Sequence, residues 1–242
     1  QIGTNFANDY YDFINGADTP DRIGPFRATA SGAIQPLVMK RAMWITFVIA
    51  ACLGLGLIPY GSWVLLIVGF LSIICGFAYT GGPYPLGYHG WGDLLVFIFF
   101  GVIAVVFTNY VQTGQFTLEA FIVSLIVGSL TTNILVVNNY RDLKTDARAG
   151  KNTLAVRFGR NFTLYEYQVL FFIALLGTLF LWRLERELWL ALPVIIWPSS
   201  LWLRYRLAKS RTGSEYNNLL AYTAVFLLIY GLLLTLGIVL IV

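Results

Sequence analysis

The chain has 242 residues, of which 58% are hydrophobic and only 12% carry a charge, and its mean hydropathy is +0.73. Soluble domains contain about 25% charged residues, so this composition excludes an ordinary water-soluble domain and predicts a membrane protein. The formal net charge of +4 does not call for a nucleic-acid partner, because the distribution of basic residues described below accounts for it.

Long stretches without Asp, Glu, Lys or Arg predict where the chain crosses the bilayer. A membrane-spanning helix needs about 20 apolar residues, and each of these stretches supplies enough for one or two helices. They predict an all-α protein, a polytopic transmembrane helix bundle that forms a single domain over residues 1–242. We expect helices over residues 1–15, 40–58, 62–79, 92–110, 117–140, 162–182, 188–205 and 217–241.

The basic residues predict the orientation of the bundle. If the spans alternate in direction, the longer loops all lie on one side of the membrane, at residues 16–39, 80–91, 141–161 and 206–216. Of the 16 Lys and Arg residues, all but Arg183 and Arg186 lie in or beside these loops. Cytoplasmic loops carry the excess of Lys and Arg, so we expect the long loops in the cytoplasm.

Two acidic clusters lie at helix ends on this predicted cytoplasmic side. Asn8 and Asp12 are four residues apart, and so are Asn138, Asp142 and Asp146. Residues with this spacing project from one face of a helix. The shared Asn-x-x-x-Asp pattern predicts two columns of oxygen ligands that face one another across the bundle.

Oxygen ligands without His or Cys suit a hard cation such as Mg²⁺, which is commonly held by one or two carboxylates together with substrate phosphates. Basic side chains beside the clusters could hold the remaining phosphate oxygens. These are Arg22, Arg141, Lys144, Lys151 and Arg157. Carboxylates at helix ends are often merely solvated, but two matching clusters favour a site for a lipid diphosphate.

The motifs resemble those of a known family. Asn8-Asp9-Tyr10-Tyr11-Asp12-Phe13 resembles the first aspartate motif of the UbiA superfamily of intramembrane prenyltransferases, and Asn139-Tyr140-Arg141-Asp142-Leu143-Lys144-Thr145-Asp146 resembles the second. Tyr79-Thr80-Gly81-Gly82-Pro83 and Gly92-Asp93-Leu94 are similar to the loop after the fourth family helix. With Tyr110-Val111-Gln112-Thr113-Gly114, they favour the branch that prenylates 1,4-dihydroxy-2-naphthoate.

The resemblance covers nearly the whole chain and implies a fold and a reaction. The family has nine helices, of which about eight are covered here, so we expect the amino-terminal helix to be missing. The implied reaction is Mg²⁺-dependent transfer of an isoprenoid chain from a prenyl diphosphate to 1,4-dihydroxy-2-naphthoate, with loss of CO₂ and diphosphate. It would serve menaquinone or phylloquinone biosynthesis in a bacterial inner membrane or a thylakoid membrane.

The resemblance also implies roles for individual residues. The catalytic residues would be Asp12, Asp142 and Asp146. Two Mg²⁺ ions would be held by Asn8, Asp9, Asp12, Asp18, Asp142 and Asp146, although Gly16 replaces the acid that many members carry four residues after Asp12. The diphosphate would be bound by Arg22, Arg141, Lys144 and Lys151. The organic substrates would be bound by Asn138, Asn139, Tyr79, Tyr84 and Tyr140, with ordinary packing an equal alternative for the tyrosines.

Two alternatives remain. The aromatic acceptor could be another molecule, such as 4-hydroxybenzoate, homogentisate, a chlorophyllide or haem. The protein could also be a cation-coupled transporter. Transporters usually place ionisable residues near the bilayer midplane, whereas the acids here lie at predicted helix ends, which argues against transport.

Overall fold

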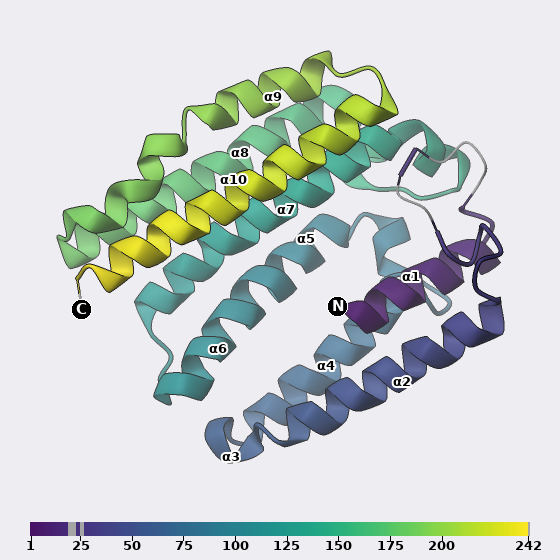
Figure 1. Cartoon of the computed structure of the whole chain (residues 1–242), viewed down its shortest axis with the longest axis horizontal. Coiled ribbons are helices and arrows are strands. Elements are labelled where there is room, and N and C mark those ends of the chain that lie inside the picture. Colours follow the sequence, from purple (N-terminus) through teal and green to yellow (C-terminus); the bar gives the residue numbers. More distant parts are fainter. Residues whose placement is uncertain (19–22, 25–26, 242) are drawn as a thin grey trace.

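The computed structural model describes residues 1–18, 23–24 and 27–241, and these residues form helices and connecting loops with no strand. One group of helices contains α1 (Ile2–Ile14), α2 (Pro36–Leu55), α3 (Ile58–Gly61) and α4 (Val64–Ala78). The other contains α7 (Leu118–Arg148), α8 (Leu154–Glu185), η3 (Leu188–Ile196), α9 (Ser199–Lys209) and α10 (Gly213–Val239). Between the two groups runs one continuous rod of α5 (Gly92–Val96), η2 (Phe97–Ile103) and α6 (Ala104–Thr113), preceded by the short η1 (Leu86–His89) (Figure 1).

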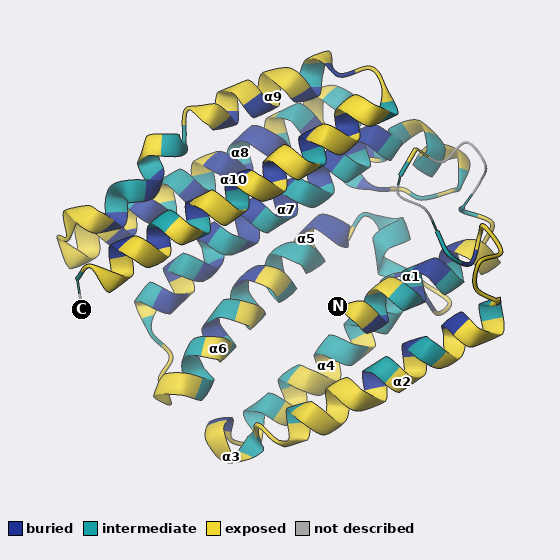
Figure 2. Cartoon of the chain, viewed as in Figure 1, coloured by how far each residue is buried: buried dark blue, intermediate teal, exposed yellow. Residues whose placement is uncertain are grey.

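The outer faces of the bundle are apolar and exposed (Figure 2). Side chains such as Val48, Ile49 and Leu53 of α2 are more than half exposed, which is unfavourable in water and favourable in lipid. Among the described residues, five helices are long and apolar enough to cross a membrane, and α4 is a shorter apolar helix. The predicted all-α, polytopic membrane protein is confirmed.

The main core lies where α7, α8 and α10 pack together. Two hydrogen bonds between side chains join α8 to α10 inside this core, each 2.7 Å long: Tyr167 to Thr223 and Thr178 to Tyr230. Hydroxyl groups buried in an apolar interior need such partners, and in a membrane they hold neighbouring helices together. These contacts pack α8 and α10 together behind α7.

The central rod packs closely on α7 through two glycines. A Cβ atom on Gly101 would lie 2.6 Å from the Cα atom of Gly128 and 2.6 Å from the carbonyl oxygen of Ser124, so no larger residue fits there. Gly101 belongs to the π-helical turn of η2, a geometry that is rare and often found at functional sites. This contact holds the rod closely against α7, the helix that carries the second acidic motif.

The prediction of a loop over residues 141–161 was wrong. Helix α7 continues through the second acidic motif to Arg148, and α8 begins at Leu154, where the Thr153 side chain accepts a hydrogen bond from the Val156 N–H group. Polar residues continue a helix readily once it leaves the bilayer, because water and side chains satisfy its end. The break in α8 comes at Gly159, whose φ of 79° suits glycine.

The span expected over 188–205 is divided. Residues Leu188–Ile196 form the 3₁₀ helix η3, and α9 begins only after Trp197 and Pro198. Pro193 and Pro198 explain the break, because proline lacks the N–H group that an α-helix interior requires. The connection expected at 206–216 is also shorter, since α9 extends to Lys209 and the Thr212–Glu215 capping box starts α10.

Candidate active site

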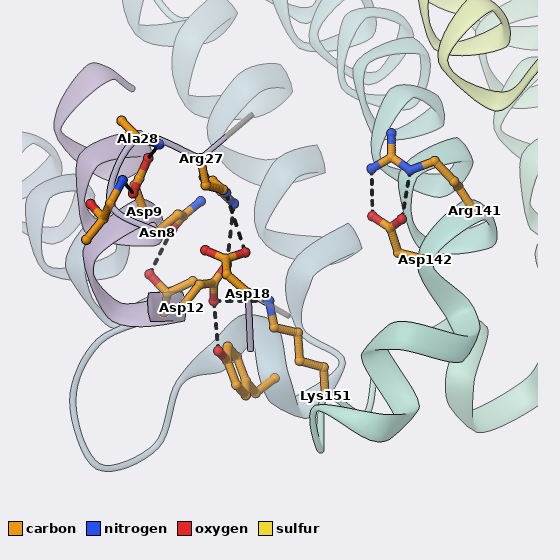
Figure 3. A network of polar contacts seen from close by, with 12 residues as sticks. Asn8, Asp9, Asp12, Asp18, Arg27, Ala28, Arg141, Asp142 and Lys151 are labelled. Carbon is orange, nitrogen blue, oxygen red and sulfur yellow. Dashed lines mark hydrogen bonds and ion pairs between the residues drawn. The ribbon is translucent and has the colours of Figure 1, made fainter. Parts of the chain in front are cut away.

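Asp12 lies at the centre of a polar network contributed by distant parts of the chain (Figure 3). Its side chain is almost fully buried near the end of α1. Lys151 Nζ lies 3.0 Å from Oδ1, Arg27 Nη2 lies 3.3 Å from Oδ2, and the Tyr88 hydroxyl donates a 2.7 Å hydrogen bond to Oδ1. Lys151 also lies 4.7 Å from the centre of the Tyr88 ring. Two cations and a phenol therefore surround the carboxylate.

The other polar residues of the first motif bind neighbouring loops. The Asp9 carboxylate accepts hydrogen bonds from the backbone N–H groups of Ala28 (3.1 Å) and Thr29 (3.0 Å), which anchors the following loop to α1. Asn8 Oδ1 accepts a 2.8 Å hydrogen bond from the Thr80 hydroxyl. Asp18 lies 3.8 Å from Arg27 Nε, in the network around Asp12.

The second motif lies across from this network on α7. Figure 3 shows the Arg141–Asp142 pair on α7, to the right of Asp12, Asp18 and Lys151. Arg141 donates two hydrogen bonds to the Asp142 carboxylate, of 2.7 and 2.6 Å, and one of 2.8 Å to Asn217 of α10. The Arg141 side chain is fully buried while Asp142 remains partly exposed, so the pair is anchored in the core and presents the acid outward.

An apolar cavity begins beside the first motif. Its volume is about 420 Å³, and it lies between α1, α4 and the rod formed by α5, η2 and α6. Asn8 and Tyr79 line it at the end near Asp12, which follows Asn8 by one helical turn. Ser72, Ile103 and Ala104 line its far end within the bundle. A polar head at the acidic motif and a hydrocarbon tail in this cavity would both find suitable surroundings.

A model of the UbiA prenyltransferase family matches residues 1–230. The chain belongs to this family. It is 36% identical over 231 residues to the 1,4-dihydroxy-2-naphthoate octaprenyltransferase of Mycobacterium tuberculosis (strain ATCC 25618 / H37Rv), covering 96% of this chain and 78% of that relative. It is 42% identical over 165 residues to the protein of the same name from Escherichia coli (strain K12), covering 66% of this chain and 54% of the relative.

A solved structure supports the fold. It comes from work described as structural and mechanistic insights into the biosynthesis of digeranylgeranylglyceryl phosphate synthase in membranes. The TM-score is 0.63 at 18% identity, over 97% of this chain and 80% of the other. The resemblance stated from the motifs, the helical membrane fold and the prenyltransferase class of enzyme are thus confirmed.

Two tyrosines of this UbiA family site have a raised pKa, partly because of the carboxylates around them. Burial, followed by the charge of Asp12 and its hydrogen bond, raises the pKa of Tyr88 far above its ordinary value. Burial also raises the pKa of Tyr79, just beyond the end of α4, and the charges of Asp93, Asp12 and Asp146 add to the effect. Both phenols therefore remain protonated, and Tyr79 lies within electrostatic range of both acidic motifs.

The remaining predicted site residues that the structure describes are spread over the loop after α4 and over α7. Tyr84 stacks on His89 in the loop, with ring centres 3.6 Å apart, and Tyr140 is buried between Arg160 and Tyr216. Asn138 is half-buried and Lys144 is exposed on α7. Asn139 donates to the Asp93 carboxylate. The predicted diphosphate ligand Arg22 lies outside the described residues.

Sequence reasoning missed three residues in this region. Arg27 and Tyr88 both contact Asp12, and Asp93 contacts Asn139. Arg27 follows the first acidic motif in the loop that Asp9 anchors, and the other two lie in or just after the loop that supported the family resemblance. No regular spacing links these residues to the acidic motifs, so only the fold brings them together.

The oxygen donors suit Mg²⁺ that is shared with a diphosphate. Among the described residues, no group of three or more His, Cys, Asp or Glu side chains is gathered closely enough to hold a metal ion alone. Mg²⁺ is typically bound by one or two carboxylates plus substrate phosphates, and the chain offers carboxylates on both α1 and α7. The lysine and arginine beside Asp12 could then bind phosphate oxygens.

Proposed function

We propose that this chain transfers an isoprenoid group from a prenyl diphosphate to 1,4-dihydroxy-2-naphthoate, with Mg²⁺, releasing diphosphate and CO₂. The observation that carries the proposal is the apolar cavity that begins at Asn8 and Tyr79, one helical turn from the Asp12 network. A prenyl diphosphate has a polyanionic head and a long hydrocarbon tail, and these two adjoining environments match its two ends. The naphthoate acceptor is favoured by the names of the relatives.

The two acidic motifs would hold the metal ions. Asn8, Asp12 and Asp18 would bind on the side of α1, and Asp142 and Asp146 on the side of α7. Mg²⁺, when bound, supplies positive charge that stabilises the departing diphosphate. Asp9 would instead keep the loop in place, because both of its oxygens already accept backbone N–H groups.

The basic residues would bind and stabilise the diphosphate as its bond to the prenyl carbon breaks. Lys151 and Arg27 already lie within 3.3 Å of Asp12, so a diphosphate in this network would meet both cations. Arg141 would hold Asp142 in position, because it is itself fixed by Asn217. The apolar residues on the walls of the cavity would limit the access of water, which would otherwise capture the allylic cation.

The bundle is proposed to lie with this site at the cytoplasmic face of its membrane. The basic residues that favour this orientation include Lys151 and Arg27, which both contact Asp12. A cytoplasmic site would receive the water-soluble acceptor from the cytoplasm and the prenyl tail from the lipid.

A transfer assay in liposomes tests the function. Purified protein would be given labelled geranylgeranyl diphosphate and dihydroxynaphthoate, with Mg²⁺ or with EDTA, and then 4-hydroxybenzoate and homogentisate as alternative acceptors. We expect a prenylated naphthoquinol that requires Mg²⁺. Product with another acceptor alone would contradict the naphthoate assignment, and a folded protein that transfers to no acceptor would contradict the proposed reaction.

A further inference from the structure

Asp93 is a buried carboxylate that the proposed donor chemistry does not use. It is the second residue of α5 and is 5% exposed. The Asn139 side chain donates to both of its oxygens, over 3.3 and 3.4 Å. Asn139 is part of the second acidic motif, so this contact ties the start of α5 to the site.

The surroundings of Asp93 differ from those of the other site carboxylates. Asp12 has Lys151 and Arg27 beside it, and Asp142 has Arg141. Within the part of the chain that the structure describes, Asp93 forms no ion pair with a lysine or arginine. A buried carboxylate is costly unless hydrogen bonds satisfy it, and two long amide contacts leave much of its accepting capacity unused. Such a group suits a neutral hydrogen-bond donor better than an anionic diphosphate.

Asp93 does not itself line the cavity, but it lies next to residues that do. A Cβ atom on the preceding Gly92 would lie 2.9 Å from the Tyr79 hydroxyl, so the start of α5 touches this phenol. Tyr79 lines the cavity, as do Leu95 and Val96 on the same helix as Asp93. The charges of Asp93, Asp12 and Asp146 all act on the Tyr79 phenol, so these carboxylates lie near it. A flat aromatic ring next to Tyr79 would thus have the prenyl donor on one side and Asp93 within reach.

We propose that Asp93 is the acceptor-binding carboxylate: held by Asn139, it accepts a hydrogen bond and then the proton from the acceptor hydroxyl next to the carbon that is prenylated. This inference rests on the proposed function. The inference adds Asp93 to the catalytic residues and explains why the acceptor ring needs a hydroxyl group beside the prenylated carbon.

The proton and electrons balance through this residue. The ring carbon that bears the carboxylate forms a bond to the prenyl carbon, whose bond to the diphosphate oxygen breaks with its electron pair leaving on the diphosphate. The hydroxyl proton moves to Asp93, which leaves a ketone beside the new quaternary carbon. Loss of CO₂ then returns the electron pair of the broken carbon–carboxylate bond to the ring, and Asp93 gives the proton back to the oxygen.

Kinetics of Asp93→Asn and Asp93→Glu test the assignment, with Glu119→Gln as the matched control. Glu119, like Asp93, is the acidic residue in the first turn of its helix, but it lies at the other end of α7 from the site. The parent and the three variants would be assayed in liposomes with donor and acceptor varied separately. Binding of the prenyl diphosphate with Mg²⁺ would be measured without acceptor.

We expect Asp93→Asn to lower kcat/KM for the naphthoate about 10²-fold, in the range of general acid–base effects, while donor binding changes less than about twofold. Asp93→Glu should restore part of the activity, and Glu119→Gln should match the parent. An acceptor analogue with hydrogen in place of that hydroxyl should react poorly with the parent protein and lose little more with Asp93→Asn.

Three outcomes would overturn the inference. Wild-type acceptor kinetics in Asp93→Asn would remove Asp93 from the reaction. Loss of diphosphate binding would make it part of the donor or metal site instead. Equal further losses for the acceptor and its analogue would show that Asp93 does not act on the hydroxyl. A parent protein that prenylates no acceptor would instead reject the proposed function, so the two failures can be told apart.

Discussion

Lys151 Nζ lies 3.0 Å from the Asp12 carboxylate, although 139 residues separate the two in the chain. The contact brings the connection between α7 and α8 onto the end of α1, and so closes one end of the site across the bundle. Both residues also contact Tyr88, which comes from a third segment. A positive charge held at this point by three segments is well placed for a diphosphate.

Replacing Lys151 by methionine should weaken binding and departure of the diphosphate. Hydrogen bonds to charged groups contribute about 1.5–3 kcal/mol, so kcat/KM for the prenyl diphosphate should fall about ten- to a hundredfold. Steady-state kinetics with varied donor measure this. Lys209→Met, at an exposed lysine at the end of α9, is the control. Equal kinetics for Lys151→Met and Lys209→Met would remove Lys151 from the diphosphate site.

Asp9 and Asp12 should behave differently although they lie in one motif. Asp12→Asn should raise the Mg²⁺ concentration needed for half-maximal activity by about tenfold or more, because it removes a carboxylate ligand. Asp9→Asn should leave that concentration nearly unchanged but loosen the loop whose N–H groups it accepts, so trypsin should cleave after Arg27 faster. A titration of Mg²⁺ and a timed digestion check both. A large Mg²⁺ effect of Asp9→Asn would return Asp9 to the metal ligands.

The far end of the cavity should limit the length of the prenyl tail. Ser72→Phe adds a ring there and should reduce transfer from geranylgeranyl diphosphate about tenfold relative to geranyl diphosphate, since overfilling a packed space costs about 1–3 kcal/mol. Gly69→Phe, where a Cβ meets nothing within 4 Å on the exposed side of α4, is the control. An unchanged ratio of the two donors in Ser72→Phe would mean that the tail binds elsewhere.

Tyr88 predicts a pH dependence of stability. Its pKa is raised in the folded protein, chiefly by burial and by Asp12, so the protonated phenol stabilises the fold below the ordinary pKa of about 10 and this contribution is lost as pH rises above it. The difference in melting temperature between the parent and Tyr88→Phe should therefore be larger at pH 8 than at pH 10.5. Thermal unfolding in detergent measures it. A difference that grows with pH would contradict the sign.

The sequence predicted the membrane-spanning helices well because charges are excluded from a bilayer core, as in the stretch between Arg41 and Asp93. It failed where helices leave the bilayer, since polar residues such as Asp142 and Asp146 fit a solvated helix end as well as a loop. The hydrogen-bond and packing partners of the site residues were harder to predict than the helices. The spacing of the residues does not show that Arg141 donates hydrogen bonds to both Asp142 and Asn217. Nor does it show that the Tyr140 side chain is buried in the core beside Tyr216.

The most direct test uses dihydroxynaphthoate labelled in its carboxyl group, with geranylgeranyl diphosphate and Mg²⁺, in liposomes that contain this protein. Released CO₂ and prenylated product would be counted in the same reaction. The proposed function predicts equal amounts of both, abolished by EDTA, strongly reduced by Asp12→Asn and retained in Lys209→Met. A folded protein that forms no product, or a product that keeps the labelled carboxylate, would contradict it.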